Sequence, residues 1–292
     1  MTKRILLAAT AGVALIASAA LAQTETPAGA NANGYASATV QVWQAEYANQ
    51  GIGVDAEYFY AVDNEEIGKY SKATGEMVDA WIDPEGGPAI HFDSAVVVDG
   101  LLYASHSNYR TWPMTSSIEI FDTATMEHVD TYSLGIYMGS LTWIDYHDGA
   151  FWGTFANYDN TGRAAIDGGD VFPYGNKLNT QVVRFDENWR VAEAWVIPPE
   201  ILERFEDMSN SGGSWGPDGN LWLSGHDPAE VYVMQLPEMG SELVWLATVP
   251  LAIEGQGIAW DRSADVPTLY GILRPDRTVI VSEITIPATA TP

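Results

Sequence analysis

Three histidines of this 292-residue chain stand beside groups that suit proton transfer. His91 lies two residues before Asp93, His226 directly precedes Asp227, and His106 opens the stretch His-Ser-Asn-Tyr. An unperturbed imidazole titrates near pH ~6.5, so it exchanges protons at neutral pH, and a nearby carboxylate can serve as a base or nucleophile or can orient the ring. The pattern predicts acid–base catalysis by these three histidines and two aspartates.

Other residues suit substrate binding rather than proton transfer. An arginine holds a carboxylate through its bidentate fork, amides supply hydrogen bonds, and tyrosine or tryptophan rings stack on sugar rings. The residues predicted to bind a substrate are Gln50, Asn108, Tyr109, Asn157, Tyr158, Trp215, Gln256 and Arg274.

A single divalent metal ion is a second chemistry that the same residues allow. Zinc or another transition ion would take His91, His106 and His226 with Asp93 or Asp227. Calcium would instead prefer an oxygen-rich set, namely Asp63, Asn108, Asn157, Asp159 and Asp227. The sequence holds no metal motif of short spacing, so both the ion and the need for one stay open.

The elements that must position these residues are short strands. Runs rich in Val, Ile, Tyr, Trp and Phe alternate with Asp-Gly and Thr-Gly turns, and no long amphipathic helix interrupts them. The runs fall into sets of four, repeated about every ~40–45 residues, which is the signature of a β-propeller. The stretch QGIGVD at residues 50–55 returns as QGIAWD at residues 256–261, so it marks the same place in two repeats.

We count five such sets and predict an all-β, five-bladed propeller. The last set has only three strands, and we expect residues 39–44 to supply the fourth as the outermost strand. The third and fourth sets begin at Ser140 and Gly212, a span long enough for a sixth blade as the alternative. Only four strand-like runs fill that span, however, and the rest is polar loop with a short helical stretch at residues 199–205.

Propeller geometry brings the candidates together, because first strands begin, and second strands end, on the same face around the axis. The side chains expected there include His91, His106, Asn157, His226 and Arg274. A convergent polar cluster is the default ligand site, although such groups can also simply hydrogen-bond one another and water. The long connection at residues 158–179 is either a lid over this face or a surface insertion.

Charge, cysteine count and the N-terminal segment limit the partners and the compartment. Residues 1–22 have a basic start, an apolar run and an Ala-Leu-Ala ending, which predicts a signal peptide cleaved after Ala22 and a secreted or periplasmic protein. We expect a flexible spacer at 23–38, the propeller at 39–287 and a tail at 288–292.

A net charge of −26 argues against nucleic acid and anionic membranes as partners. We expect no membrane span and a monomer whose fold, lacking cysteine, stands on its core alone.

The repeated units resemble the lactonase-like propeller group, which includes gluconolactonase-type and cycloisomerase-like secreted proteins. The resemblance covers residues 39–287 and rests on four-strand units whose Asp-Gly turns are followed by Leu-Tyr, Phe-Trp or Leu-Trp. Those relatives commonly have six or seven blades, and their metal-binding carboxylates have no matching positions here, so none is carried over.

Together these observations predict an enzyme, a hydrolase or lyase acting on a carbohydrate-derived or lactone substrate. The alternative is a propeller that binds a small molecule or carbohydrate without turnover. A repeat-built lectin should repeat its pocket in every blade, whereas this chain has Gln, His, Ser, Ser and Gln at the equivalent strand starts. One asymmetric site fits an enzyme, or the binder of one small molecule, better than a multivalent lectin.

Overall fold

The computed structural model describes residues 32–109, 111, 113–136, 138–159 and 176–288. The predicted signal peptide, most of the predicted spacer, the central part of the 158–179 connection and nearly all of the predicted tail lie outside these residues. No helix within the described residues is long and apolar enough to cross a membrane.

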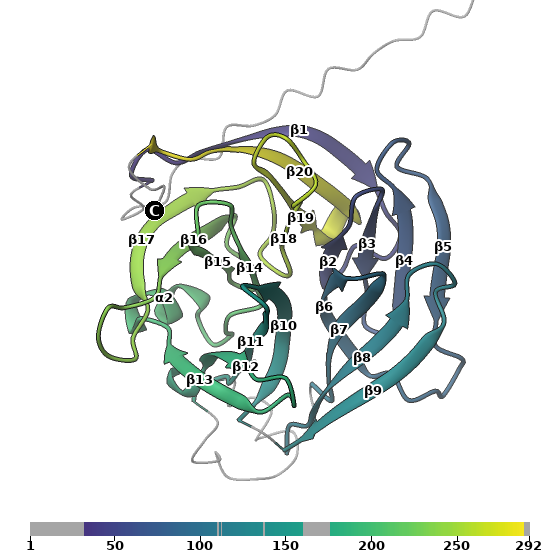
Figure 1. Cartoon of the computed structure of the whole chain (residues 1–292), viewed down its shortest axis with the longest axis horizontal. Coiled ribbons are helices and arrows are strands. Elements are labelled where there is room, and N and C mark those ends of the chain that lie inside the picture. Colours follow the sequence, from purple (N-terminus) through teal and green to yellow (C-terminus); the bar gives the residue numbers. More distant parts are fainter. Residues whose placement is uncertain (1–31, 110, 112, 137, 160–175, 289–292) are drawn as a thin grey trace, which may run out of the picture.

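The chain forms five four-stranded antiparallel sheets arranged as blades around an axis, so the prediction of a five-bladed propeller is confirmed (Figure 1). The strands of blade 1 are β2 (Gly51–Val54), β3 (Tyr58–Val62), β4 (Glu66–Ser71) and β5 (Met77–Ile82). The strands of blade 2 are β6 (His91–Val98), β7 (Leu101–Ser107), β8 (Ser116–Asp122) and β9 (His128–Gly135). The strands of blade 3 are β10 (Ser140–His147), β11 (Ala150–Ala156), β12 (Gln181–Phe185) and β13 (Val191–Val196). The strands of blade 4 are β14 (Gly212–Trp215), β15 (Leu221–Ser224), β16 (Glu230–Gln235) and β17 (Val244–Pro250).

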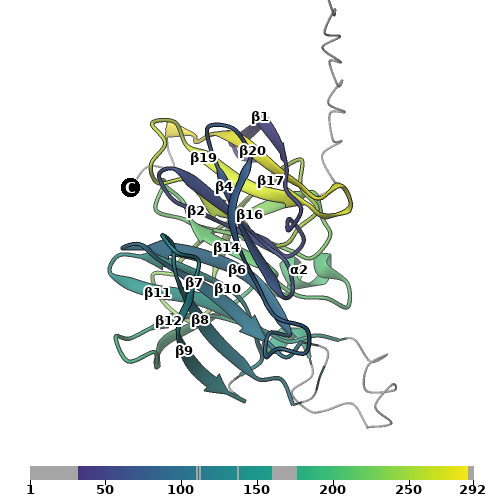
Figure 2. The ribbon, with the colours of Figure 1, turned by 90° about the vertical axis from the view of Figure 1, so that its right-hand side faces the viewer.

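Blade 5 combines both ends of the described chain. It contains β18 (Ala259–Trp260), β19 (Thr268–Leu273), β20 (Thr278–Thr285) and, outermost, β1 (Ala36–Gln44). Strand β1 runs antiparallel to β20 from the pair Ala36–Thr285 to the pair Gln44–Thr278. Figure 2 shows β1, β19 and β20 together at one side of the ring, with the strands of blade 2 at the other. The N-terminal strand therefore closes the last blade, as the three-stranded final repeat predicted.

Strand β1 begins three residues before the predicted start of the propeller, and the residue before it is also part of the fold. Tyr35 is only 5% exposed, and its ring packs edge-on against Trp222 of blade 4 at 5.4 Å. Its hydroxyl donates to the Asp218 carboxylate at 3.0 Å. These contacts of Tyr35 attach the segment before β1 to blade 4, whereas β1 itself completes blade 5.

Local sequence explains the hairpins and the core. Asp99 and Gly100, like Asp148 and Gly149, both have positive φ, which is the backbone of a two-residue turn between twisted strands. The apolar side chains of the strands gather in five buried clusters, each shared by two neighbouring blades. Full burial of one large side chain contributes about 1.5–3 kcal/mol. The ring therefore holds together through its interblade contacts.

The few helical segments are single turns in the connections. They are η1 (Lys177–Asn179), α2 (Pro199–Leu202), η2 (Glu203–Phe205) and η3 (Arg274–Asp276). The short helical stretch predicted at residues 199–205 corresponds to α2 and η2. Between Ser140 and Gly212 the only strands that the described residues form are the four of blade 3, so the sixth blade considered from the sequence is not formed.

The similarity of QGIGVD at residues 50–55 to QGIAWD at residues 256–261 is explained by packing. Backbones of different blades touch at Gly257, because a Cβ placed there would lie 2.7 Å from the Cα of Gly51 and 3.2 Å from the carbonyl oxygen of Asp93. The Gly257 N–H also donates to the Gln50 carbonyl at 2.9 Å. Glycine at Gly51 and Gly257 thus allows the innermost segments of blades 1 and 5 to meet directly.

Candidate functional site

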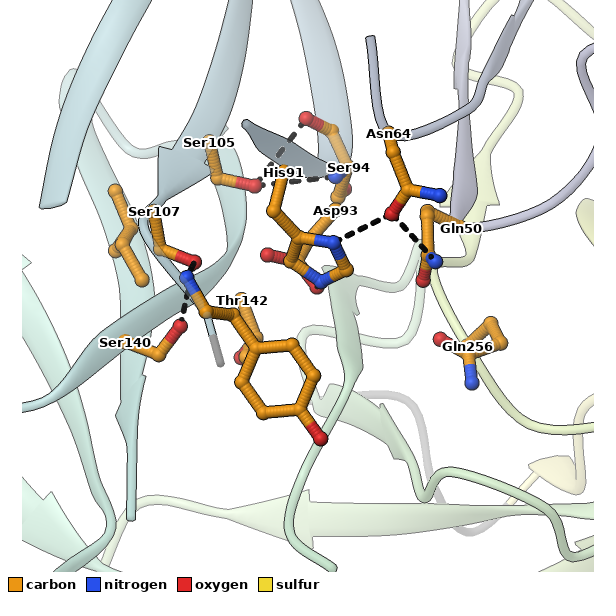
Figure 3. A network of polar contacts seen from close by, with 12 residues as sticks. Gln50, Asn64, His91, Asp93, Ser94, Ser105, Ser107, Ser140, Thr142 and Gln256 are labelled. Carbon is orange, nitrogen blue, oxygen red and sulfur yellow. Dashed lines mark hydrogen bonds and ion pairs between the residues drawn. The ribbon is translucent and has the colours of Figure 1, made fainter. Parts of the chain in front are cut away.

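The most connected polar group on the predicted face is centred on His91, the first residue of β6. Its Nδ1 lies 2.5 Å from Asn64 Oδ1, and its Nε2 lies 3.2 Å from Asp93 Oδ1. Asn64 Oδ1 also accepts from Gln50 Nε2 at 3.1 Å, while its own Nδ2 donates to Asp63 Oδ1 at 3.2 Å. Figure 3 shows Gln50, Asn64, His91 and Asp93 converging from blades 1 and 2.

These contacts define where the protons of the pair must be. Because the Asn64 oxygen only accepts, His91 Nδ1 carries a hydrogen and donates it. Contact between Nε2 and the Asp93 oxygen then needs a further proton between them, since two lone pairs would otherwise face each other. Asn64 thereby fixes the ring orientation, and the His91–Asp93 pair shares one transferable proton.

A β-bulge brings Asp93 into this position. In the pairing of β6 with β7, Phe92 lies opposite His106 and Ser94 opposite Ser105, so Asp93 is the extra residue. A bulge re-aims one side chain without ending the strand and is frequent beside active sites. Strand β10 has the same irregularity at Thr142, between Leu141 and Trp143. The equivalent bulges explain why Asp93 and Thr142 both appear among the central polar side chains in Figure 3.

Asp93 keeps one oxygen uncommitted despite its burial. The residue is 5% exposed, and its Oδ2 has no hydrogen-bond partner among the described residues. A buried carboxylate oxygen without a partner is costly, so such atoms in native proteins call for an explanation. This oxygen is enclosed in the structure, so the side chain must turn toward the face for a substrate or water hydrogen to satisfy it. Its missing partner makes Asp93 the strongest candidate base of the site.

Two tyrosines extend the site from His91 toward the third blade. The ring of Tyr109 lies 4.9 Å from the His91 ring and 5.1 Å from the ring of Tyr158. Both tyrosines were predicted to bind substrate, and the structure brings them together beside the proposed acid–base pair.

A second polar group lies where blades 4 and 5 meet. His226 Nδ1 contacts Asp227 Oδ1 at 2.7 Å, and Arg274 Nη2 lies 3.4 Å from His226 Nε2. Gln256 is 1% exposed and donates from Nε2 to the His226 carbonyl at 3.0 Å. Its φ of +66° is unusual for a non-glycine residue, and such strained backbone tends to cluster at functional sites.

Asn108 and Asn157 shape the loops of this face through their own hydrogen bonds. Asn108 accepts from the Thr115 N–H at 2.7 Å and donates to the Pro113 carbonyl at 2.9 Å, which closes the connection between β7 and β8. Asn157 is 2% exposed and donates to the Met138 carbonyl at 2.8 Å. It also lines a cavity of about 470 Å³ between blades 2 and 3. Asn157 therefore faces a space that a ligand can enter.

The structure does not bring His106 into the central group. The ring contacts Phe92 at 5.1 Å and lines a separate cavity of about 310 Å³ with Glu119 and His128. Its Nε2 accepts from the Ile90 N–H at 3.0 Å, so the neutral ring carries its proton on Nδ1. Burial lowers the pKa of His106 below its ordinary value, although Glu119 acts in the opposite direction.

Trp215 also lies elsewhere. It ends β14 at the face opposite the His91 group, is 4% exposed and stacks on His147 at 4.3 Å. Its backbone N–H donates to the buried Asp145 carboxylate at 2.7 Å, and Arg262 pairs with the same carboxylate at 2.7 Å. These contacts tie the inner strands together at that face.

Several hydroxyl groups that were not predicted to be catalytic or substrate-binding surround the His91 group. Ser140 Oγ donates to Ser107 Oγ at 2.8 Å, linking blades 3 and 2, and Thr142 Oγ1 donates to the Asn210 carbonyl at 2.9 Å, linking blades 3 and 4. All four residues are almost completely buried. The sequence carried part of this signal, since Ser140 begins β10 and Thr142 follows two positions later, whereas Ser107 stands at the end of β7.

The donor groups do not fit a metal ion. No three His, Asp or Glu side chains of the described residues are grouped closely enough to hold one. His106 points into a different cavity from His91, and both nitrogens of His226 already have partners. We therefore assign no catalytic step to a metal.

Comparison with known proteins adds evidence about the fold. No protein-family model matches the sequence, and no curated protein matches it. Among solved structures, a glutaminyl cyclase from Myxococcus xanthus matches with a TM-score of 0.57 at 8% identity, covering 87% of this chain and 98% of that one. A luciferin-regenerating enzyme matches with a TM-score of 0.48 at 11% identity, covering 87% and 96%.

At these identities the first likeness shows a shared fold. The fold is compatible with an enzyme, and the residues of the site must carry the case for any particular activity. The resemblance to the lactonase-like group stays a prediction.

Proposed function

We propose that this protein is a secreted or periplasmic, monomeric enzyme that hydrolyses or eliminates a carbohydrate-derived or lactone substrate at the His91–Asp93 pair. The observation that carries the proposal is the buried Asp93 carboxylate, with one oxygen against His91 Nε2 at 3.2 Å and the other without a partner among the described residues. This arrangement offers a base and an acid from two adjacent groups.

In lactone hydrolysis, Asp93 Oδ2 would take a proton from an attacking water as its oxygen bonds to the carbonyl carbon. The ring C–O bond then breaks, and the leaving oxygen receives the proton that His91 Nε2 shares with Asp93. In elimination, the same carboxylate oxygen would take a proton from carbon while the departing oxygen is protonated. Asn64 acts as a positioning residue in both, because its bond to Nδ1 holds the imidazole in place.

Binding without turnover is the alternative, since the same groups can hydrogen-bond a bound sugar. The likeness to a glutaminyl cyclase supports an enzyme on this fold, and a glutaminyl substrate therefore belongs in the first assay. The Tyr109 and Tyr158 rings beside His91 favour a ring-shaped ligand in either case.

The test is a panel of sugar lactones, uronate-containing sugars and a glutaminyl peptide, followed by proton release and by ultraviolet absorbance of unsaturated products. His91→Gln and Asp93→Asn should each lower kcat by about 10²–10⁴-fold, the usual contribution of a positioned acid or base. His128→Gln is the matched control, because His128 lies in the separate cavity with Glu119. Binding by calorimetry without any turnover would favour the alternative, and unchanged rates in both variants would refute the proposed roles.

A further inference from the structure

Among the described residues, Arg274 lacks the carboxylate partner that four of the five other arginines have. Arg184, Arg204, Arg262 and Arg277 each pair with a carboxylate. Arg274 is half-buried at the start of η3, and among the described residues no carboxylate lies within ion-pair distance of it. This is notable in a chain with 39 acidic residues against 13 basic ones. Within the described part of the chain, the one side-chain hydrogen-bond contact of Arg274 is with His226 Nε2, at 3.4 Å.

That contact determines the state of His226. A guanidinium donates only and keeps its proton, so His226 Nε2 must accept, and the hydrogen on Nδ1 is donated to Asp227 at 2.7 Å. The imidazole is therefore neutral and holds Asp227 on the side of the ring away from Arg274. The Asp227 side chain is 68% exposed and leaves the guanidinium charge uncompensated at close range.

Arg274 is joined to the His91 group by a continuous chain of polar contacts. The Gln256 side chain donates to the His226 carbonyl. Gly257, which follows Gln256 in the chain, donates from its backbone N–H to the Gln50 carbonyl at 2.9 Å. Gln50 in turn donates to Asn64, which holds His91. Figure 3 shows Gln256 and Gln50 beside the His91 group, on one side of it. A small ligand lying across this face would meet Arg274 at one end and Asp93 at the other.

We infer that Arg274, oriented by His226, binds a carboxylate of the substrate, so that the substrate is a sugar acid, or the lactone of a sugar diacid, whose free carboxylate lies away from the bond that reacts. A guanidinium with free donors matches a carboxylate bidentately. Asp93 belongs to blade 2 and Arg274 to blade 5. The carboxylate that Arg274 binds must therefore lie apart from the group that reacts at Asp93. That the bound molecule is a substrate rests on the proposed function, but carboxylate binding at Arg274 can be measured independently of any reaction.

The experiment uses the full mature protein carrying His91→Gln, so that binding is seen without turnover. Glucuronate, galacturonate and gluconate are titrated by calorimetry against glucose as the neutral match. We expect at least one acid to bind, and Arg274→Gln in the same background to weaken it about 10- to 100-fold, the value of hydrogen bonds to a charged group. Arg190→Gln, at an exposed turn position, is the charge-matched control and should bind like the parent.

The outcomes separate this inference from the proposed function. Failure of all three acids to bind, or equal binding by the Arg274→Gln variant, overturns the inference. Binding that depends on Arg274 in a protein that turns over nothing refutes the proposed enzyme and leaves the carboxylate site. Turnover of neutral lactones that Arg274→Gln does not change leaves the enzyme and refutes the carboxylate site. Thermal unfolding of the variant checks that its fold is intact.

Discussion

Replacing Gly257 by alanine tests whether the inner strands truly meet at the axis. The new methyl group would lie 2.7 Å from the Cα of Gly51, 3.2 Å from the Asp93 carbonyl oxygen and 3.3 Å from the Gln50 carbonyl oxygen. Carbon atoms prefer about 3.5–4.0 Å, so backbone of blades 1 and 2 would have to move by most of an ångström. Overpacking of this kind costs about 3 kcal/mol, the upper part of its usual range.

The measurement is thermal unfolding by circular dichroism, with Gly149→Ala as the matched control. Gly149 has a φ of +75° and nothing within 4 Å of its added Cβ, so the control carries backbone strain alone, about 1 kcal/mol. In a domain of this size, Tm should fall by about 6–12 °C in Gly257→Ala and by about 2–4 °C in Gly149→Ala. Ligand binding should weaken only in Gly257→Ala, because Gln50 and Asp93 share the displaced backbone. A Gly257→Ala protein at least as stable as the control would refute direct contact at the axis.

Two further predictions concern stability. The folded-state pKa of His106 is lowered by burial, so the unfolded chain takes up a proton first, and stability falls as pH drops below about 6.5 with a slope of at most ~1.4 kcal/mol per pH unit. Urea unfolding at several pH values should show a shallower fall in His106→Gln; an identical profile would contradict this. Tyr35→Phe removes the 3.0 Å hydrogen bond to Asp218 and should cost about 1.5–3 kcal/mol, whereas Tyr35→Ala also loses the ring and should cost more. In urea unfolding, a Tyr35→Phe protein as stable as the parent would show that the hydroxyl contact contributes nothing, and equal costs in the two variants would show that the ring contributes nothing.

The architecture followed from local signals that act over a few residues. Two-residue turns such as Asp99-Gly100 need positive φ at both positions, and the sequence marks them directly. The missing fourth strand of the last repeat led to the pairing of β1 with β20, because an incomplete blade leaves an unpaired edge. Such signals gave the number of blades and the face on which first strands begin.

The site was harder to predict, because strand alternation shows which side chains share a side but not where the alternation breaks. Ser105 and Ser107 bond toward the central group, so the intervening His106 necessarily points to the other side of its strand. The bulge at Asp93 breaks the alternation of β6, because Asp93 is an extra residue without an opposite partner on β7. Its side chain therefore reaches the centre, although regular alternation would place neighbouring Asp93 and Ser94 on opposite sides of the strand. Two polar residues in succession were its only mark in the sequence.

Trp215 illustrates a different limit. A strand of four residues covers about 10 Å, which is enough to carry a side chain from one face of the ring to the other. Trp215 stands at the far end of β14, and its indole packs near His147 instead of the predicted site. A site residue at the beginning of an inner strand and a core residue at its end are only three positions apart.

The pairing of β1 with β20 also has a consequence for how the ring assembles. These strands are separated by nearly the whole domain, so β1 has no ladder partner until the last strand of the chain exists. Contacts of such long sequence separation are slow to form, since the chain between them must first be brought together. Blades 1 to 4 each contain only consecutive strands and can form in order as the chain emerges. Closure of blade 5 is thus the step at which the N-terminal and C-terminal strands of the domain pair with each other. Until then β1 is an unpaired edge strand, which can associate with other molecules.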